Sequence, residues 1–489
     1  MRLVVVLTAI IVIGLTTIRI IQLQDIEPRM DQAFMVDWVQ SIYESDHILP
    51  DRSSDQGWLA ALEADQDSFL YAVVKPIYVA NTTIFVVGSL IWFSLGSLFI
   101  GISASAQVVL SIIGHSLMLL CLAALPIYGA GRNVAMLNER RIIGILALAI
   151  AAASSFLHGF SPLGAHNVGV LTLIAAVLIS GRYLAVFKTG NNSFRDLVAV
   201  IVIQAIACYS FYTNVFLLPT ATFGLLLFQA PPKLSRRLPE AFRFSILTVL
   251  SMLPALLLIA LTALRPHAVA GAEDFVDLGR WVFEGGDQSF LLVIADNFTS
   301  WFTRQAEIFS ATGLTLAIAG LAVLSTRYRQ PLPLGIVVMH LIVWTIMARF
   351  GAQGAQYTRT SVYVAPFLAL GLATLVVCMA QWTVRQHKTQ PIRAYGLAAT
   401  AIAGLAAHLA TDLPRLSDLR KTPGWGAYYS DQNIWRPLVR EIESTAQANA
   451  VIFPWDQSTA YMIRILRRRD PGNITVIRPF ERLYEQYSR

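Results

Sequence analysis

Charged residues are scarce in this chain of 489 residues: Asp, Glu, Lys and Arg make up 14% of it, whereas hydrophobic residues make up 55%. A soluble domain carries about 25% charged residues. The composition therefore excludes a soluble globular enzyme, a disordered protein and a coiled coil, and it indicates an integral membrane protein. Cysteines are also few. Cys121, Cys208 and Cys378 all lie in apolar stretches, so no disulfide framework is expected.

Acidic residues and lysines are missing from the middle of the long apolar runs. A membrane-crossing helix needs about 20 mostly apolar residues. Runs of this kind occur at 3–22, 107–128, 142–158, 167–187, 196–212, 214–230, 243–264, 308–326, 331–348, 363–383 and 394–411. Proton-coupled pumps and charge-translocating transporters place ionisable groups near the membrane midplane. Their absence here means that chemistry is expected at a membrane face.

Basic residues gather in alternate short loops between these runs. The net charge of +7 therefore reports membrane orientation and does not indicate a nucleic-acid partner. If 84–101 does not cross the membrane, all the basic clusters share the side of Met1–Arg2, which the positive-inside rule makes cytoplasmic. We therefore predict about eleven transmembrane helices and a C-terminus on the outer side. In this interpretation 84–101 is an interfacial or re-entrant helix.

Two domains are predicted, a transmembrane domain over 1–411 and an extracytoplasmic domain over 412–489. The first outer loop, 23–106, is expected to hold amphipathic surface helices, because apolar residues recur with near-helical spacing after Asp31. In the C-terminal domain 450–454 and 474–477 are predicted strands, with a helix near 457–469 between them. The predicted fold class is an all-α polytopic membrane protein with a small α/β C-terminal domain.

Several short motifs follow one another along the chain: Asp31-Gln32-Ala33-Phe34, Leu49-Pro50, Lys75-Pro76, Tyr212-Thr213-Asn214 and Gln356-Tyr357-Thr358-Arg359. Their order resembles that in the GT-C glycosyltransferases, which include protein mannosyltransferases and lipid A aminoarabinose transferases. The chain departs from the family pattern at three places. Gln32 replaces the second residue of an acidic pair, His166-Asn167 replaces a later acidic residue, and Asn214 replaces a lysine. The resemblance therefore identifies no subfamily.

The resemblance implies a sugar transfer from a polyprenyl-phosphate donor with inversion at the anomeric carbon. Such a reaction needs a carboxylate that accepts the proton of the acceptor hydroxyl, and Asp31 is the candidate. Cations stabilise the lipid-phosphate leaving group, and Lys75 and Arg359 are the candidates. Further substrate or metal contacts are expected from Asp37, His166, Asn167 and Tyr357. Dependence on a divalent cation such as Mg²⁺ or Mn²⁺ is left open.

The implied acceptor is a cell-surface glycan, lipid or protein on the periplasmic side of a bacterial inner membrane. Two alternatives remain open. The first is a lipid-linked glycan transporter or flippase, which needs a cationic, polar central cavity. The second is a non-catalytic membrane assembly protein. An enzyme requires Asp31, Lys75 and Arg359 to converge on one outward-facing cavity, whereas an assembly protein lets them diverge.

Three other residues have a structural interpretation. Arg19 is expected to extend from the end of the first apolar run to the membrane surface. Trp92 and Trp301 are expected in the interfacial aromatic belt.

Overall fold

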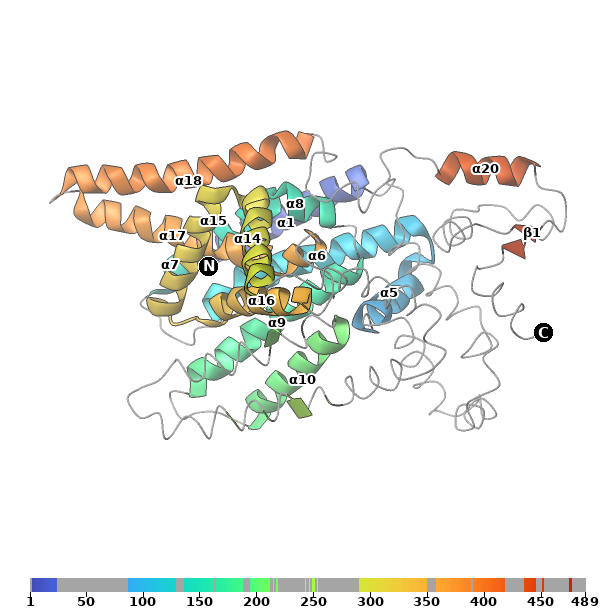
Figure 1. The fold of residues 1–489 in the computed structure, drawn as a ribbon, viewed down its shortest axis with the longest axis horizontal. Coiled ribbons are helices and arrows are strands. Elements are labelled where there is room, and N and C mark those ends of the chain that lie inside the picture. The colour runs from blue at the N-terminus through green and yellow to red at the C-terminus, as the bar shows by residue number, and fades with distance from the viewer. Residues whose placement is uncertain are drawn as a thin grey trace.

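The computed structural model describes residues 2–23, 87–128, 136–161, 164–187, 194–211, 290–349, 358–387, 390–417, 435–445, 451–452 and 475–476, together with a few single positions between 214 and 253. This part of the chain is almost wholly helical (Figure 1). The helices and one 3-10 segment are α1 (Arg2–Leu23), α5 (Val87–Ile100), α6 (Ala104–Tyr128), α7 (Leu137–Ala153), α8 (Ser155–Phe160), α9 (Gly164–Phe187), α10 (Phe194–Ser210), α14 (Phe290–Phe309), α15 (Ala311–Thr326), α16 (Leu332–Arg349), η2 (Thr358–Tyr363), α17 (Ala365–Gln386), α18 (Pro391–Ser417) and α20 (Trp435–Thr445).

Four helices in the described ranges are long and apolar enough to cross a membrane, or five if the bent pair α14–α15 counts as one span. The four segments are Ser105–Tyr128, His166–Tyr183, Ala365–Arg385 and Pro391–Leu416. The chain is thus a multi-pass, all-helical membrane protein in its described core, as the apolar runs predict. Two predicted spans, 214–230 and 243–264, lie almost entirely outside the described residues.

The predicted span 142–158 is wrong as one continuous helix. It breaks at Ser154, which has an extended backbone (ψ 118°) and separates α7 from α8. The Ser154 side chain accepts a hydrogen bond from the Leu157 N–H and caps α8. A short polar residue that satisfies the first turn of a new helix explains why the break occurs there.

A second break, at Ser310, turns the chain by 101° between α14 and α15. Ser310 has a positive φ of 59°, and its hydroxyl accepts from the Gly313 N–H at 3.1 Å. The sequence predicts a single span over 308–326, whereas the structure ends one helix at Phe309 and starts another at Ala311. Most of α14 therefore falls between the predicted spans 243–264 and 308–326.

Four helix ends meet at what we call the basic end of the bundle, around Arg140 and Arg327. Glu139 at the start of α7 accepts from Arg327, just after α15, at 3.0 Å. Arg327 also donates to Gln381 near the end of α17 at 2.9 Å. Gln330 donates to the Pro126 carbonyl near the end of α6 at 3.1 Å. Arg140 and Arg327, which belong to two of the basic clusters, thus lie at the same end of the bundle.

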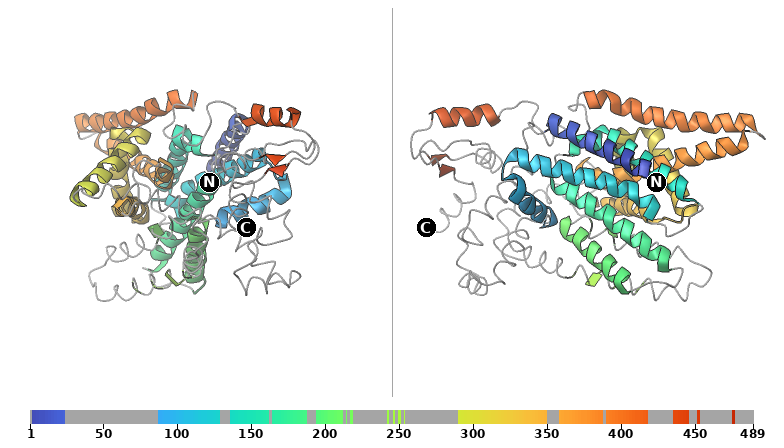
Figure 2. Two further views of the ribbon diagram at one scale, coloured as in Figure 1. Left: turned by 45° about the vertical axis from the view of Figure 1, so that its right-hand side comes forward. Right: turned by 180° about the vertical axis from the view of Figure 1, so that it is seen from behind.

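The other end, which we call the η2 end, brings together α8, η2, the start of α9 and the end of α18. Asp412 on α18 accepts from the Ser155 N–H at 3.1 Å and from its hydroxyl at 2.5 Å, so it caps α8 from a different helix. The second Asp412 oxygen lies 3.3 Å from His408 Nε2. Seen from behind, α1, α6, α9 and α10 run side by side between the two ends (Figure 2, right).

The ambiguous segment 84–101 contains α5, a helix of 14 residues. At a rise of about 1.5 Å per residue it is about 21 Å long, shorter than the roughly 30 Å of a bilayer core. Both of its ends lie near the η2 end. A Cβ at Gly88 would meet the last residue of α10, Ser210, and one at Gly96 would meet Leu110 early in α6. These contacts favour the interfacial or re-entrant interpretation.

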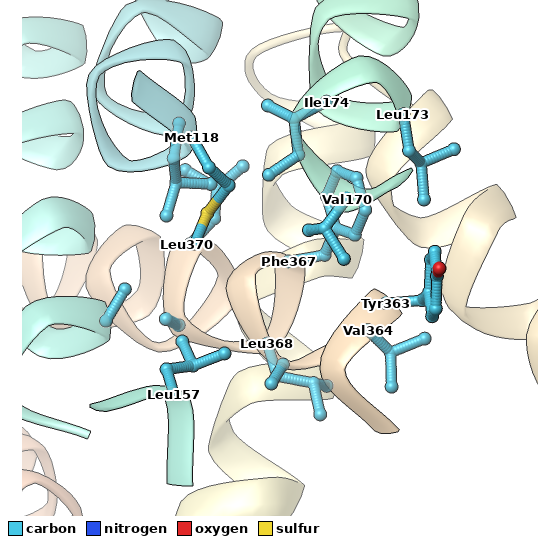
Figure 3. Packing of buried hydrophobic residues seen from close by; sticks show 14 of the residues in the cluster. Met118, Leu157, Val170, Leu173, Ile174, Tyr363, Val364, Phe367, Leu368 and Leu370 are labelled. Carbon is cyan, nitrogen blue, oxygen red and sulfur yellow. The ribbon is translucent and has the colours of Figure 1, made fainter. Parts of the chain in front are cut away.

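The densest packing joins α15 to α17. A Cβ on Gly320 would lie 1.8 Å from the Gly371 carbonyl oxygen, and a Cβ on Gly371 would lie 2.1 Å from the Ala317 oxygen. Glycine at both positions is what lets the two backbones approach. Figure 3 shows how η2 and α17 pack against α6, α8 and α9; the labelled residues are Met118, Leu157, Val170, Leu173, Ile174, Tyr363, Val364, Phe367, Leu368 and Leu370.

In the C-terminal region β1 (Val451–Ile452) and β2 (Thr475–Val476) pair in parallel, with Val451 opposite Thr475. Both strands lie within the segments predicted as strands. The predicted helix over 457–469 is outside the described residues, and the domain limits 1–411 and 412–489 stay predictions. The last spanning helix, α18, continues to Ser417, beyond the predicted limit at 411.

Candidate functional site at the η2 end

Three of the seven predicted site residues fall in described segments, and all three lie at the η2 end. His166 and Asn167 are in the first turn of α9, and Arg359 is placed by its backbone in η2. The other four, Asp31, Asp37, Lys75 and Tyr357, lie outside the described residues. The segments that carry His166, Asn167 and Arg359 thus lie at the η2 end, whereas the convergence of Asp31, Lys75 and Arg359 expected of an enzyme stays a prediction.

An aromatic group joins the start of α9 to the end of η2. The His166 ring lies 4.9 Å from the Phe211 ring and 6.1 Å from the Tyr363 ring, measured between centroids. The Phe211 and Tyr363 rings are 5.2 Å apart. All three side chains are buried. His166, which the family resemblance put forward as a substrate or metal contact, thus packs within an aromatic triangle.

Two neighbouring residues make this close approach feasible. A Cβ on Gly169 would lie 2.6 Å from the Tyr363 hydroxyl oxygen and 2.8 Å from Phe211 Cβ, so a larger residue would push η2 and α10 away from α9. Asn214 donates to the Gly169 and Ala207 carbonyls at 2.9 Å each. The residue that replaces a family lysine therefore ties α9 to α10.

Asn167 holds α9 to α6 and α8. Its buried amide Nδ2 donates to the Ser111 hydroxyl at 2.8 Å and to the Ser161 carbonyl. The Ser111 hydroxyl in turn donates to the Ser161 carbonyl at 2.7 Å. Asn167 therefore has a structural task at the place where the family carries an acidic residue.

Arg19 is fully buried, so the expectation that it reaches the membrane surface is wrong. Its Nε donates to His158 Nδ1 at 3.0 Å, and one terminal nitrogen donates to the Ala152 carbonyl at 3.0 Å. Ala152 lies in the last turn of α7, whose carbonyls lack helical partners because the helix breaks at Ser154. The helix break at Ser154 thus leaves the Ala152 carbonyl available to accept a hydrogen bond from the Arg19 guanidinium inside the bundle.

A third basic side chain, His115 on α6, belongs to the same cluster. It is completely buried and lies within electrostatic range of Arg19 and His158. Next to it the Ser116 and Thr16 hydroxyls are 2.5 Å apart, which fixes α6 against α1 one turn before Arg19. Residues that are far apart in the sequence thus form one polar cluster in the half of the bundle that carries η2.

The segment η2 is held from the opposite side by α14 and α16. Trp301 is 1% exposed and donates from its indole nitrogen to His340 Nδ1 at 3.0 Å. The second ring nitrogen of His340 lies 3.1 Å from the Thr360 carbonyl in η2. Gln305 donates to the Ser361 hydroxyl at 2.8 Å. The expectation that Trp301 belongs to the interfacial belt is therefore wrong.

The basic end contains a different kind of polar cluster. The Tyr328 hydroxyl donates to Glu139 at 2.8 Å and lies 3.5 Å from the Cys378 sulfur. Burial, together with these two hydrogen bonds, raises the pKa of Tyr328 above its usual range. Burial also lowers the pKa of Arg140, which remains a cation because arginine starts so high. This ion-paired cluster stabilises the meeting of four helix ends.

A divalent cation finds no ready set of ligands among the residues that the structure describes. No group of three or more His, Cys, Asp or Glu side chains in those ranges is arranged to hold a metal ion. The Asn167 amide is engaged with carbonyls and with Ser111.

Comparison with solved structures relates the fold to membrane glycosyltransferases. An oligosaccharyltransferase from Archaeoglobus fulgidus, crystallised with zinc and sulfate, matches with a TM-score of 0.54 and 14% identity over 98% of this chain. The same protein tethered to an acceptor peptide with the NVT sequon gives 0.53 and 12% identity over 98% of this chain. ArnT from Cupriavidus metallidurans, bound to undecaprenyl phosphate, gives 0.49 and 12% identity, with 99% of this chain and 88% of ArnT covered.

The chain shares its fold with the archaeal oligosaccharyltransferase, which is a GT-C membrane glycosyltransferase. The resemblance proposed from the short motifs is thus confirmed at the level of the fold. The chain spans 62% and 64% of the length of the two oligosaccharyltransferase chains. No protein-family model matches the sequence, and no curated protein matches it.

Sequence reasoning missed the residues that hold the η2 end together, namely Arg19, Asn214, Trp301, Gln305 and His340. One signal was present. In 290–309 the residues Phe298, Trp301, Phe302, Gln305, Ile308 and Phe309 repeat with helical spacing, which is typical of an amphipathic helix. The pairing of Trp301 with His340 leaves no such signal, because it joins residues on different helices.

Proposed function

We propose that the protein transfers a sugar from a polyprenyl-phosphate carrier to an acceptor at the outer face of the membrane, with inversion at the anomeric carbon. The observation that carries this proposal is the fold shared with the archaeal oligosaccharyltransferase along nearly the whole chain. The GT-C motif order, from Asp31 to Arg359, supports the same reaction class.

In this proposal Asp31 accepts the proton of the acceptor hydroxyl or amide as the new bond to the anomeric carbon forms. Lys75 and Arg359 stabilise the negative charge on the departing lipid phosphate. Arg359 suits this task because its planar fork can donate two parallel hydrogen bonds to phosphate oxygens. Asp37, His166, Asn167 and Tyr357 are proposed as further contacts around the substrates.

The η2 end is the proposed chemical end, facing a bacterial periplasm, and the basic end is proposed to face the cytoplasm. This assignment rests on the positive-inside rule, because Arg140 and Arg327, members of two basic clusters, lie at the end opposite η2. The acceptor is a cell-surface glycan, lipid or protein. A protein acceptor has a precedent in the archaeal oligosaccharyltransferase structure, which holds an acceptor peptide with the NVT sequon.

The test is sugar transfer in membranes supplied with a labelled polyprenyl-phosphate sugar, with lipid, glycan and peptide fractions counted separately. We expect Asp31→Asn to lower transfer by about a hundredfold or more, as for the loss of a general base. Asp46→Asn, in the same predicted outer loop, is the matched control and should keep transfer near the native level. Equal transfer by Asp31→Asn and the native protein would remove Asp31 from the mechanism.

The proposed role of Arg359 in binding the donor phosphate is tested by one variant that keeps the positive charge and one that removes it. Arg359→Lys keeps the charge but loses the two-point contact, so we expect it to raise the KM for the donor by about tenfold. Arg359→Ala should lower transfer further. If both variants retain native donor KM values, the phosphate-binding role of Arg359 is wrong.

A further inference from the structure

The 3-10 segment η2 receives hydrogen bonds from two different helices directly after Arg359. His340 on α16 lies 3.1 Å from the Thr360 carbonyl, and Gln305 on α14 donates to the Ser361 hydroxyl at 2.8 Å. Thr360 and Ser361 are the two residues that follow Arg359. Any movement of their backbone would move Arg359 as well.

The Trp301 contact fixes how His340 is protonated. An indole N–H can only donate, so the Nδ1 that faces it at 3.0 Å must be the unprotonated acceptor. In a neutral imidazole the proton then resides on Nε2, which donates to the Thr360 carbonyl. Two hydrogen bonds thus link α14 to η2 through α16. In the first Trp301 donates to His340, and in the second His340 donates to the Thr360 carbonyl.

The shape of α14 places both donors toward η2. Trp301 and Gln305 are one helical turn apart and both are buried, whereas Thr299 and Thr303 are exposed on the other side. The 101° bend at Ser310 turns α14 away from the direction of α15, so its buried face can reach η2. One helix therefore supplies two contacts to the same short segment, one direct and one through His340.

We infer that Trp301, Gln305 and His340 are positioning residues that hold η2, and with it Arg359, in the place where the donor phosphate binds. This inference rests on the proposed function for its substrate, but the holding of η2 can be measured without any substrate. The three residues act through η2 and are not expected to touch the sugar.

Backbone amide hydrogen exchange over 358–363 tests the holding of η2. Trp301→Phe keeps an aromatic ring but removes the indole N–H donor and one ring, and Gln305→Leu removes the second contact at similar volume. We expect each to speed exchange over 358–363 by about tenfold, the effect of losing one buried hydrogen bond. If exchange is unchanged in both variants, the inference is overturned.

The chain offers matched controls for both variants. Trp92→Phe removes an indole donor that binds the Leu110 carbonyl at 3.2 Å. Gln204→Leu removes a buried amide that donates to the Ser180 hydroxyl at 3.1 Å. Neither bond involves η2, so exchange over 358–363 should stay native. Acceleration by the controls equal to that of the test variants would show a general loosening and would also overturn the inference.

The proposed effect on binding of the sugar donor is tested by measuring how the rate of sugar transfer depends on the concentration of that donor. We expect Trp301→Phe and Gln305→Leu each to raise the donor KM by about tenfold, while kcat changes by less than twofold. Faster exchange with an unchanged donor KM would show that η2 is held for another purpose, which overturns the assignment to donor binding. If the native protein transfers no sugar, the proposed function fails, while faster exchange would still support the holding of η2.

Folding of each variant is followed by size-exclusion elution in detergent. A variant that loses its single elution peak is replaced by a milder variant of the same contact. His340→Gln replaces Trp301→Phe, and Gln305→Asn replaces Gln305→Leu. These keep a polar group but shift it, so a smaller acceleration of exchange over 358–363 is expected. Native exchange in a well-folded replacement would contradict the inference.

Discussion

The contact between α15 and α17 makes a sharp prediction about Gly320, because no side chain fits there. A Cβ added at Gly320 would lie 1.8 Å from the Gly371 carbonyl oxygen and 2.6 Å from the carbonyl carbon of the same residue. Ordinary van der Waals contact begins at about 3.4 Å. The obstacle is backbone, which cannot rotate away as a side chain can. Gly320→Ala must therefore push the two helices apart.

The magnitude follows from two opposing terms. Alanine stabilises a helix by about 1 kcal/mol relative to glycine. Overpacking of a close-packed contact costs about 1–3 kcal/mol, and occasionally more, and a rigid backbone obstacle belongs at the upper end. We therefore expect Gly320→Ala to lower the free energy of unfolding by about 2 kcal/mol. Gly371→Ala should behave in the same way, since its Cβ would lie 2.1 Å from the Ala317 oxygen.

Gly396 on α18 is the matched control, because nothing lies within 4 Å of a Cβ built there. Gly396→Ala should leave the protein as stable as the native form or stabilise it by up to about 1 kcal/mol. The assay is thermal unfolding of the purified protein in detergent, followed by tryptophan fluorescence. If Gly320→Ala and Gly396→Ala unfold at the same temperature, the close crossing of α15 and α17 is wrong.

Two further predictions concern the ends of the bundle. Asp412→Ala should destabilise the protein by about 3 kcal/mol, because the Ser155 N–H and hydroxyl lose their buried acceptor. As a control, Asp296→Ala at an exposed position of α14 should change stability by less than about 0.5 kcal/mol. Equal unfolding temperatures for the two variants would contradict the capping of α8 by Asp412. Glu139→Gln should lower the free energy of unfolding by about 1–2 kcal/mol, because it weakens the bond to Arg327. The donor KM should stay native, since Glu139 lies at the basic end. A tenfold rise in donor KM would refute the separation of the two ends.

The helices could be predicted from the sequence because a helix that crosses a membrane needs only a local property, a long apolar run. The runs at 3–22, 107–128 and 167–187 correspond closely to α1, α6 and α9. The break at Ser154 was not predicted, since two adjacent serines in an apolar run are no strong signal. It depends on the capping of α8 by Ser154 and on Asp412, a residue from another helix.

The candidate site was predicted only in part, for a related reason. Motif order pointed to His166, Asn167 and Arg359, and the structure brings their segments together at one end. The residues that hold those segments lie far away in the sequence: 39 positions separate Trp301 from His340, and 139 separate Arg19 from His158. No periodicity connects such pairs. The sequence can show that a histidine has apolar neighbours along the chain, but it cannot show which hydrogen-bond donor from another helix will face the histidine ring.

The placement of polar residues inside the bundle bears on the transporter alternative. A transporter for lipid-linked glycans needs a polar path between the two ends. Within the described ranges, Arg19, His115 and His158 gather in the half that carries η2, and the Glu139–Arg327 pair lies at the basic end. The fully buried residues between these clusters on α6, α7 and α17 are predominantly apolar, among them Met118, Leu122, Leu148, Leu370 and Leu372. Crossing this layer would strip a glycan of its hydrogen bonds to water, at a cost of roughly 1–3 kcal/mol for each unpaired group. Within the described ranges an apolar layer thus separates the two polar clusters, which is the opposite of the polar path that a transporter needs.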